Sequence, residues 1–185
     1  MARTPSTMLA LGTPMPPFAL TDAITGARVD SAQVSAGKRG TLVMFICNHC
    51  PFVVHVRAAL IGVAHEALDR GLAVVAINSN SIDSHPQDGP EHMAKLARDE
   101  GWRFPFVFDD TQAVAKAYDA ACTPDLYLFD AAGKLAYRGQ LDDSRPGNDI
   151  APSGRDLRAA VSAVAEGVAP SQDQRPSLGC NIKWK

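Results

Sequence analysis

Apolar residues follow two different periods along the chain, and these periods predict strands that alternate with helices. Continuous apolar runs of strand length occur at residues 41–46 and 72–77, which is typical of strands covered on both faces. Between them, residues 52–69 place apolar side chains at helical spacing, and Gly71 follows as a stop signal. This alternation predicts a sheet with right-handed crossovers and helices on both of its faces.

Weaker patterns complete the expected order of elements. A turn around Gly133 joins two strand patterns into a hairpin, which gives the sheet an antiparallel edge and makes it mixed. We therefore expect one α/β domain over residues 1–185, with an extended segment at 1–17 and a polar, proline-marked tail at 169–185. Further strands are predicted at residues 18–20, 104–108, 124–129 and 134–140, and the chain is expected to turn after the first of these and to return through Val29. Further helices are predicted at residues 91–100, 111–118 and 156–167.

Composition narrows the class of protein. The chain is 46% hydrophobic and 21% charged, values typical of a globular protein. The net charge of −2 argues against nucleic acid as a partner, and the absence of an 18-residue apolar run argues against a membrane span. The first twenty residues make a poor secretory signal, and four cysteines do not make a disulfide scaffold. We expect a cytoplasmic protein, monomeric or homodimeric, with reduced thiols and no cofactor.

The strongest chemical signal is the pentapeptide Cys47-Asn48-His49-Cys50-Pro51, where a predicted buried strand turns into the long helix. Two cysteines at this spacing can close a disulfide across one helical turn. We expect the helix dipole to favour a thiolate at Cys47, with His49 adding a donor or a positive charge. Pro51 suits the first helical turn, where a missing N–H is no loss.

Zinc binding is an alternative use of the same residues. Cys47, His49, Cys50 and His55 offer four candidate ligands, but the chain has no second CxxC to complete a typical site. The context of the motif therefore favours redox chemistry and no metal, and zinc or unrelated core cysteines stay open as alternatives.

A second signal lies about 75 residues later, at Cys122-Thr123-Pro124, just before a predicted strand. A proline at the start of a strand is a candidate cis peptide, although only about 5% of X–Pro bonds are cis. The proline by itself is weak evidence, and its combination with the CxxC is what makes the Thr123–Pro124 bond a candidate.

Together these motifs resemble the thioredoxin-fold redoxin family of AhpC/TSA type, which includes the peroxiredoxins. The resemblance runs from about Leu11 to Gly167 and rests on the opening LGTPMPPFALTDAITG, on CNHCP and on TPDLYLFD with the hairpin after it. The chain is most similar to a peroxiredoxin-like group with a CNHCPFV active site and a GCNIKWK-like tail.

The resemblance implies a thiol–disulfide oxidoreductase with a thioredoxin-like fold. Cys47 is then the attacking thiolate and Cys50 the resolving thiol, while cis-Pro124 presents the Thr123 backbone to an incoming substrate strand. The implied partners are protein or small-molecule disulfides and thiols, together with a thiol electron donor.

Several positions depart from the family patterns. If Cys50 is compared with a peroxidatic cysteine, Cys47 stands where peroxiredoxins have threonine, and the segment around Pro124 has no arginine. Asn48-His49 replaces the Gly-Pro of thioredoxins, and a histidine before the second cysteine is similar to the oxidising members. A thiol peroxidase, or a non-enzymatic redox-sensing or metal-holding module, is therefore the alternative function.

Two further cysteines are possible extra thiols. Cys122 is two residues from Pro124 and is expected to be either a small buried hydrophobe or a thiol near the active site. Cys180 lies in the tail, where it would be a mobile resolving cysteine if the tail were free. Because Ile182 and Trp184 are apolar, we expect the tail to dock and Cys180 to have no obligatory catalytic role.

Overall fold

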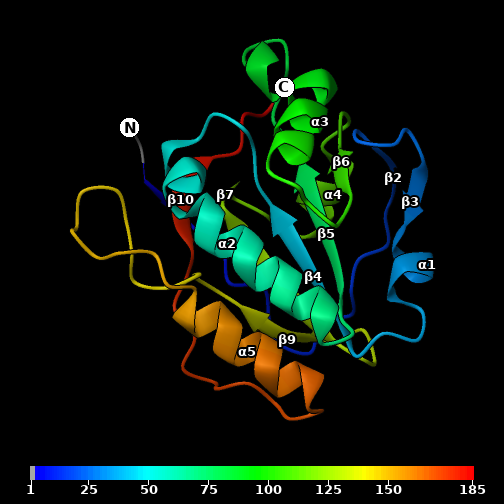
Figure 1. Ribbon diagram of the computed structural model, residues 1–185, viewed down its shortest axis with the longest axis vertical. Helices are drawn as coiled ribbons and strands as arrows, with labels where there is room; N and C mark the ends of the chain where they lie inside the picture. The colour runs from blue at the N-terminus through cyan, green and yellow to red at the C-terminus, as the bar shows by residue number, and fades with distance from the viewer. Residues whose placement is uncertain (1–2) are drawn as a thin grey trace.

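The computed structural model describes residues 3–185 and has a seven-stranded sheet at its centre (Figure 1). The strands lie in the order β3-β2-β6-β5-β4-β8-β9, in which β4, β5 and β6 run parallel and the other pairs are antiparallel. The predicted mixed sheet is confirmed. The bounds are β2 Ala19–Asp22, β3 Arg28–Asp30, β4 Gly40–Phe45, β5 Ala73–Asn78, β6 Phe106–Phe108, β8 Asp125–Asp130 and β9 Leu135–Arg138.

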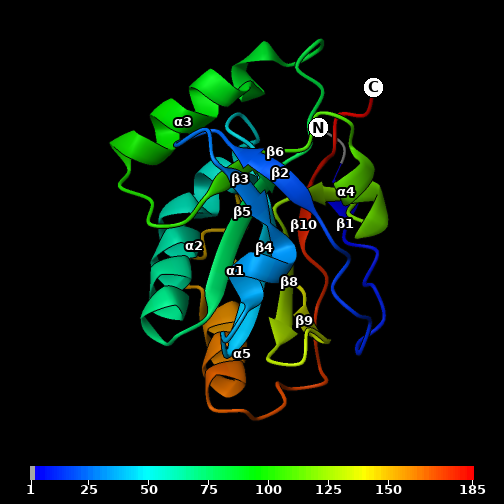
Figure 2. The same cartoon turned by 90° about the vertical axis from the view of Figure 1, so that its right-hand side faces the viewer.

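Helices cover both faces of this sheet (Figure 2). Because side chains alternate along a strand, Leu42 and Met44 of β4 face the layer of α2, α3 and α5, whereas Val43 and Phe45 face α4. All four side chains are fully buried, which explains the continuous apolar run in the sequence. The bounds are α1 Ser31–Ser35, α2 Pro51–Asp69, α3 Pro90–Asp99, α4 Ala113–Ala117 and α5 Arg155–Ala165, with a 3₁₀ turn at Pro86–Asp88.

The long helix α2 lies across the sheet and carries the active-site motif at its N-terminus. By length and composition alone it is apolar enough to cross a membrane. Its side chains Val53, Leu60 and Val63 are fully buried in the core, which accounts for that apolarity. Helix α5 packs beside it, and the Arg158 guanidinium on α5 forms an ion pair with Glu66 on α2 at 2.7 Å.

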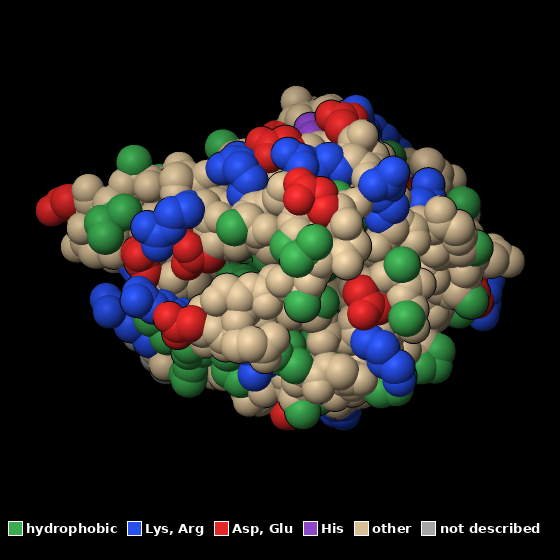
Figure 3. Space-filling view, turned by 90° about the horizontal axis from the view of Figure 1, so that it is seen from below, with side chains coloured by type: hydrophobic (Ala, Val, Ile, Leu, Met, Phe, Trp, Pro, Cys, Tyr) green, Lys and Arg blue, Asp and Glu red, His purple; other side chains and the backbone are tan. Residues whose placement is uncertain are grey.

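Charged side chains of both signs alternate over the surface that includes α5 (Figure 3). Arg155 pairs there with Asp143 at 2.8 Å, and Asp143 also accepts from Arg175 at 3.0 Å. This face therefore carries local ion pairs, and neither positive nor negative side chains dominate it.

A second, three-stranded sheet joins the two ends of the chain to the segment before Pro124. Its central strand, β10 (Leu178–Asn181), pairs antiparallel with β1 (Thr4–Pro5) on one side and β7 (Cys122–Thr123) on the other. The sequence pattern predicts only a polar tail at residues 169–185, so this strand is not predicted, and neither is the short α1. The alternation of buried Cys180 and Ile182 is too brief to be recognised among the neighbouring Pro, Gln and Asp residues.

The tail docks, as predicted, and the contact is very close at Gly179. A Cβ at this position would lie 2.0 Å from the Thr123 carbonyl oxygen and 2.6 Å from its carbon. Both are backbone atoms, which cannot move aside as the end of a side chain can. Glycine is therefore required for β10 to reach β7.

We predict that Gly179→Ala detaches or distorts β10 and lowers the free energy of unfolding by about 1–3 kcal/mol, the usual cost of overpacking. Urea unfolding, with limited proteolysis of the tail, measures both effects. Gly62→Ala is the matched control, because Gly62 lies within α2 and a Cβ there meets nothing within 4 Å. That variant should be as stable as the wild type or gain up to about 1 kcal/mol. If the two variants have the same free energy of unfolding and their tails resist proteolysis equally, the prediction is contradicted.

Candidate active site

The CxxC motif occupies the connection between the end of β4 at Phe45 and the start of α2 at Pro51. Cys50 is the N-cap residue of α2, and Pro51 is its first helical residue, as the sequence predicts. Cys47 precedes the helix, and the two cysteines are buried alike, with exposed fractions of 1% and 0%.

The two thiols converge on Thr123, which comes from a segment far away in the sequence. The Thr123–Pro124 peptide bond is cis, so the predicted candidate is confirmed. The Thr123 carbonyl oxygen lies 3.2 Å from Cys50 Sγ, and the Thr123 hydroxyl lies 3.5 Å from Cys47 Sγ. One residue thus contacts both sulfur atoms of the pair through different groups.

The negative charge of the reduced pair is more stable on Cys50 than on Cys47. A hydrogen bond from the Cys47 thiol lowers the pKa of Cys50, and the Thr123 side chain and the N–H groups of Val53 and Cys180 act in the same direction. Burial and the Thr123 carbonyl, which accepts from the Cys50 thiol, favour a protonated Cys50, and the donors prevail over both. The same hydrogen bond raises the pKa of Cys47, as do burial and the nearby Asp88 carboxylate. These pKa directions favour a Cys50 thiolate, whereas the sequence predicts a Cys47 thiolate.

Asp88 organises the two residues between the cysteines. Its carboxylate is fully buried and accepts the backbone N–H groups of Asn48 at 2.9 Å and His49 at 3.3 Å. The His49 ring bonds to it at 2.5 Å through Nδ1, and that nitrogen lies 4.0 Å from Cys47 Sγ. The Asn80 side chain donates to the same carboxylate at 2.9 Å. Asp88 therefore holds both the conformation of the loop and the position of the imidazole.

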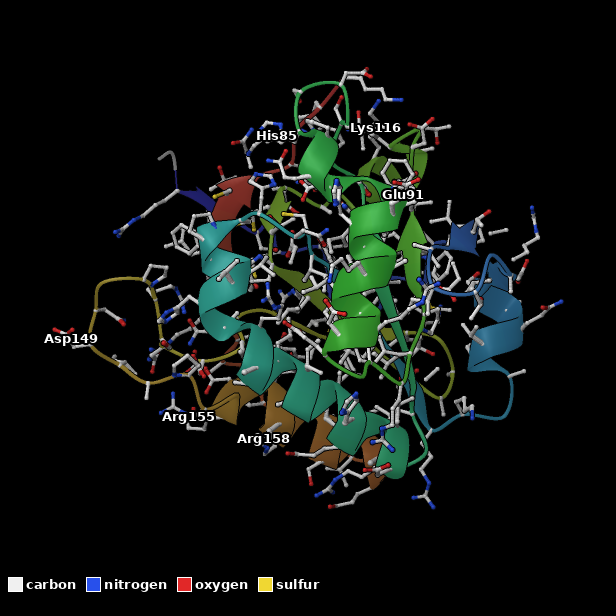
Figure 4. The ribbon with its side chains drawn as sticks, turned by 45° about the horizontal axis from the view of Figure 1, so that its top comes forward. His85, Glu91, Lys116, Asp149, Arg155 and Arg158 are labelled. Carbon is white, nitrogen blue, oxygen red and sulfur yellow. The ribbon has the colours of Figure 1, made fainter. Side chains whose placement is uncertain are left out.

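Sequence reasoning missed Asp88 and Asn80 because both lie in a polar stretch, residues 78–90, that has no periodic pattern. Nothing local distinguishes Asp88 from the exposed Asp83 of the same stretch. His85 of the same stretch stacks on His49, with ring centroids 4.6 Å apart. Figure 4 shows His85 in the loop that leads into α3. The Asn48 side chain donates to the Gln87 carbonyl at 3.0 Å, which ties the motif to this loop a second time.

The four residues considered for zinc are not brought together as a set. His55 bonds through Nε2 to the Ser144 hydroxyl at 2.7 Å. Cys47, His49 and Asp88 do place ligand atoms within 4.8 Å of one another. The Asp88 oxygens, however, already accept hydrogen bonds from backbone and side-chain donors. The geometry therefore favours a role for Asp88 in anchoring the loop rather than in binding a metal.

The two extra cysteines lie on either side of the contact between β7 and β10. Cys122 is fully buried, its thiol donates to the Pro124 carbonyl at 3.5 Å, and burial raises its pKa strongly. Cys180 is 7% exposed and lies opposite Thr123 in the antiparallel register. The Thr123 backbone, expected to be free for a substrate strand, is thus already paired with β10.

The mixed sheet, the cis proline and the CxxC at a helix N-terminus define a protein of the thioredoxin-like class. The chain belongs to the AhpC/TSA family, whose sequence model matches residues 11–138. Among curated proteins, none matches the chain.

Solved structures agree with this assignment. An uncharacterized conserved protein from Geobacillus kaustophilus is 51% identical, with a TM-score of 0.96, and the match covers 100% of this chain and 97% of that one. A hypothetical protein from Sinorhizobium meliloti is 46% identical, with a TM-score of 0.95 and 98% of each chain covered. Peroxidoxin BcpB from Mycobacterium tuberculosis shares the fold at 15% identity and a TM-score of 0.60, over 85% of this chain and 97% of that one.

We predict that Asp88→Asn lowers the pKa of Cys47, because the substitution removes a negative charge that disfavours its thiolate. A pH titration of the reduced protein, followed by thiolate absorbance, should show the Cys47 step at lower pH. Asp83→Asn is the control, since it removes an exposed carboxylate from the same loop. If both variants titrate like the wild type, the Asp88 charge does not act on the pair.

Proposed function

We propose that this protein is a thiol–disulfide oxidoreductase whose redox couple is the Cys47–Cys50 dithiol and disulfide. The observation that carries the proposal is the convergence of both sulfur atoms on Thr123, at 3.5 Å and 3.2 Å, next to a cis proline. Core cysteines without a redox role would not need a hydroxyl and a carbonyl of one residue placed against them. The family to which the chain belongs supports the same chemistry.

We assign the first step to Cys50, because the pKa directions favour its thiolate over that of Cys47. Its thiolate attacks one sulfur of a substrate disulfide, a mixed disulfide forms on Cys50, and the other substrate sulfur leaves with the electron pair. Cys47 then attacks the Cys50 sulfur and releases the second substrate thiol, which takes the proton of Cys47. The substrate gains two electrons, and the Cys47–Cys50 disulfide remains for reduction by a thiol donor. This order reverses the one that the thioredoxin resemblance implies.

A thiol peroxidase is the second candidate, and the lowered pKa of Cys50 is the observation that favours it. The Cys50 thiolate would attack one peroxide oxygen and become a sulfenic acid, while the O–O bond breaks and the other oxygen leaves as water or an alcohol. The Cys47 thiol would then condense with the sulfenic acid to a disulfide and water. Within residues 3–185, no arginine hydrogen-bonds to either thiol, so the arginine contact that the resemblance attributes to peroxiredoxins is not made there. Rapid peroxide consumption with a thiol donor would favour this candidate, and rapid insulin reduction would favour the first.

We predict that Cys50 is the sulfur that holds the mixed disulfide. The test uses a Cys122→Ser/Cys180→Ser protein, in which only the active-site pair remains. Adding Cys47→Ser should trap glutathione on Cys50 after exposure to oxidised glutathione, because no thiol is left to release it. Adding Cys50→Ser should give little adduct, since the pKa of Cys47 is raised by burial and by Asp88. Peptide mapping by mass spectrometry measures both.

The starting double variant is the control and should form the Cys47–Cys50 disulfide without a lasting adduct. An adduct on Cys47 in the Cys50→Ser protein, with an inert Cys47→Ser protein, would restore the order of attack that the resemblance implies. Failure of the control protein to form its disulfide would overturn the proposed function itself.

A further inference from the structure

The C-terminal strand brings a third thiol to the active-site pair. In the pairing of β10 with β7, Cys180 stands directly opposite Thr123. Thr123 is the same residue whose carbonyl lies 3.2 Å from Cys50 Sγ and whose hydroxyl lies 3.5 Å from Cys47 Sγ. Three cysteines from two distant segments therefore converge on one residue of a third segment.

Contacts with Cys50 distinguish Cys180 from the fourth cysteine, Cys122. Burial raises the pKa of the Cys180 thiol and the neighbouring Cys50 raises it further, while the backbone N–H of Cys180 lowers the pKa of Cys50. Cys122 faces Asn181 in the register, and its thiol is engaged by the Pro124 carbonyl.

The tail is held in this position along its whole end. Ile182 is 1% exposed and packs in the part of the core that lies between the sheet and α4. Its N–H donates to the Ala121 carbonyl at 3.1 Å. The Lys183 N–H donates to the Asn80 side chain at 2.8 Å, and Asn80 in turn holds Asp88. Cys180 is thus presented by an ordered strand, and a thiol fixed beside a disulfide competes at an effective concentration of millimolar or higher.

We propose that Cys180 is a third redox-active thiol and that Cys50 exchanges its disulfide partner between Cys47 and Cys180. The inference rests on the proposed Cys47–Cys50 couple. The Cys180 thiolate attacks the Cys50 sulfur of the Cys47–Cys50 disulfide, so the Cys50–Cys180 bond forms as the Cys47–Cys50 bond breaks. Cys47 leaves with the electron pair and takes the proton that Cys180 lost. The step is an isomerisation with no net oxidation, and it frees the Cys47 thiol beside His49.

The experiment equilibrates Cys47→Ser protein in a glutathione redox buffer and maps its disulfides after an acid quench. At equilibrium the result does not depend on which sulfur is attacked first. Oxidised glutathione is the oxidant and accepts the two electrons: it first forms a mixed disulfide on Cys50, and the Cys180 thiol then displaces the glutathione as its thiol. We expect a Cys50–Cys180 disulfide and roughly tenfold less glutathionylated Cys50 than in Cys47→Ser/Cys180→Ser. Cys47→Ser/Cys122→Ser is the matched control and should behave like Cys47→Ser.

The wild type provides a second measurement that does not depend on the folding of a variant. After oxidation it should contain Cys50–Cys180 alongside Cys47–Cys50. A wild type with only the Cys47–Cys50 bridge, or a Cys47→Ser protein with glutathione on Cys50 and a free Cys180, overturns this inference. The proposed function is tested separately, because the Cys122→Ser/Cys180→Ser protein must still form the Cys47–Cys50 disulfide.

Discussion

The antiparallel pairing of β10 with β7 at Thr123 is the contact on which the rest of the site depends. Thr123 offers its backbone to Cys180, its carbonyl to Cys50 and its hydroxyl to Cys47. Each of these groups is polar and buried, so each needs a partner inside the protein. The pairing satisfies the backbone of β7, closes the site over the two sulfurs and places the tail where an extended substrate would otherwise lie.

The closed arrangement decides where the charge of the reduced pair lies. Cys50 is surrounded by donors, one of which is the Cys180 N–H of the tail, whereas Cys47 lies near the negative Asp88. A helix N-terminus favours an anion in general, but the sulfur that benefits is the one at the cap. Because α2 begins at Pro51, that sulfur is Cys50.

A second chain of contacts links the tail to the residues between the cysteines. Asn80 accepts the Lys183 N–H and donates to Asp88, and Asp88 bonds to His49. The carboxylate and the amide are each 3% exposed or less, so these bonds are shielded from competing water. Movement of the C-terminal segment is therefore expected to reach the imidazole beside Cys47 as well as the Cys50 thiol.

The sequence by itself determined the α/β order, the mixed sheet, the redox motif at the start of α2 and the candidate cis proline. These features are local: an apolar period, a CxxC between strand and helix, and a proline before a strand. Only the tertiary structure decided which cysteine caps the helix, because the spacing of apolar residues does not locate the first residue of a helix to within one turn. It also brought Asp88, Asn80 and Cys180 to the pair. Their positions depend on contacts with loops and strands that lie about 30 to 130 residues from the motif in the sequence, and no local pattern encodes such contacts.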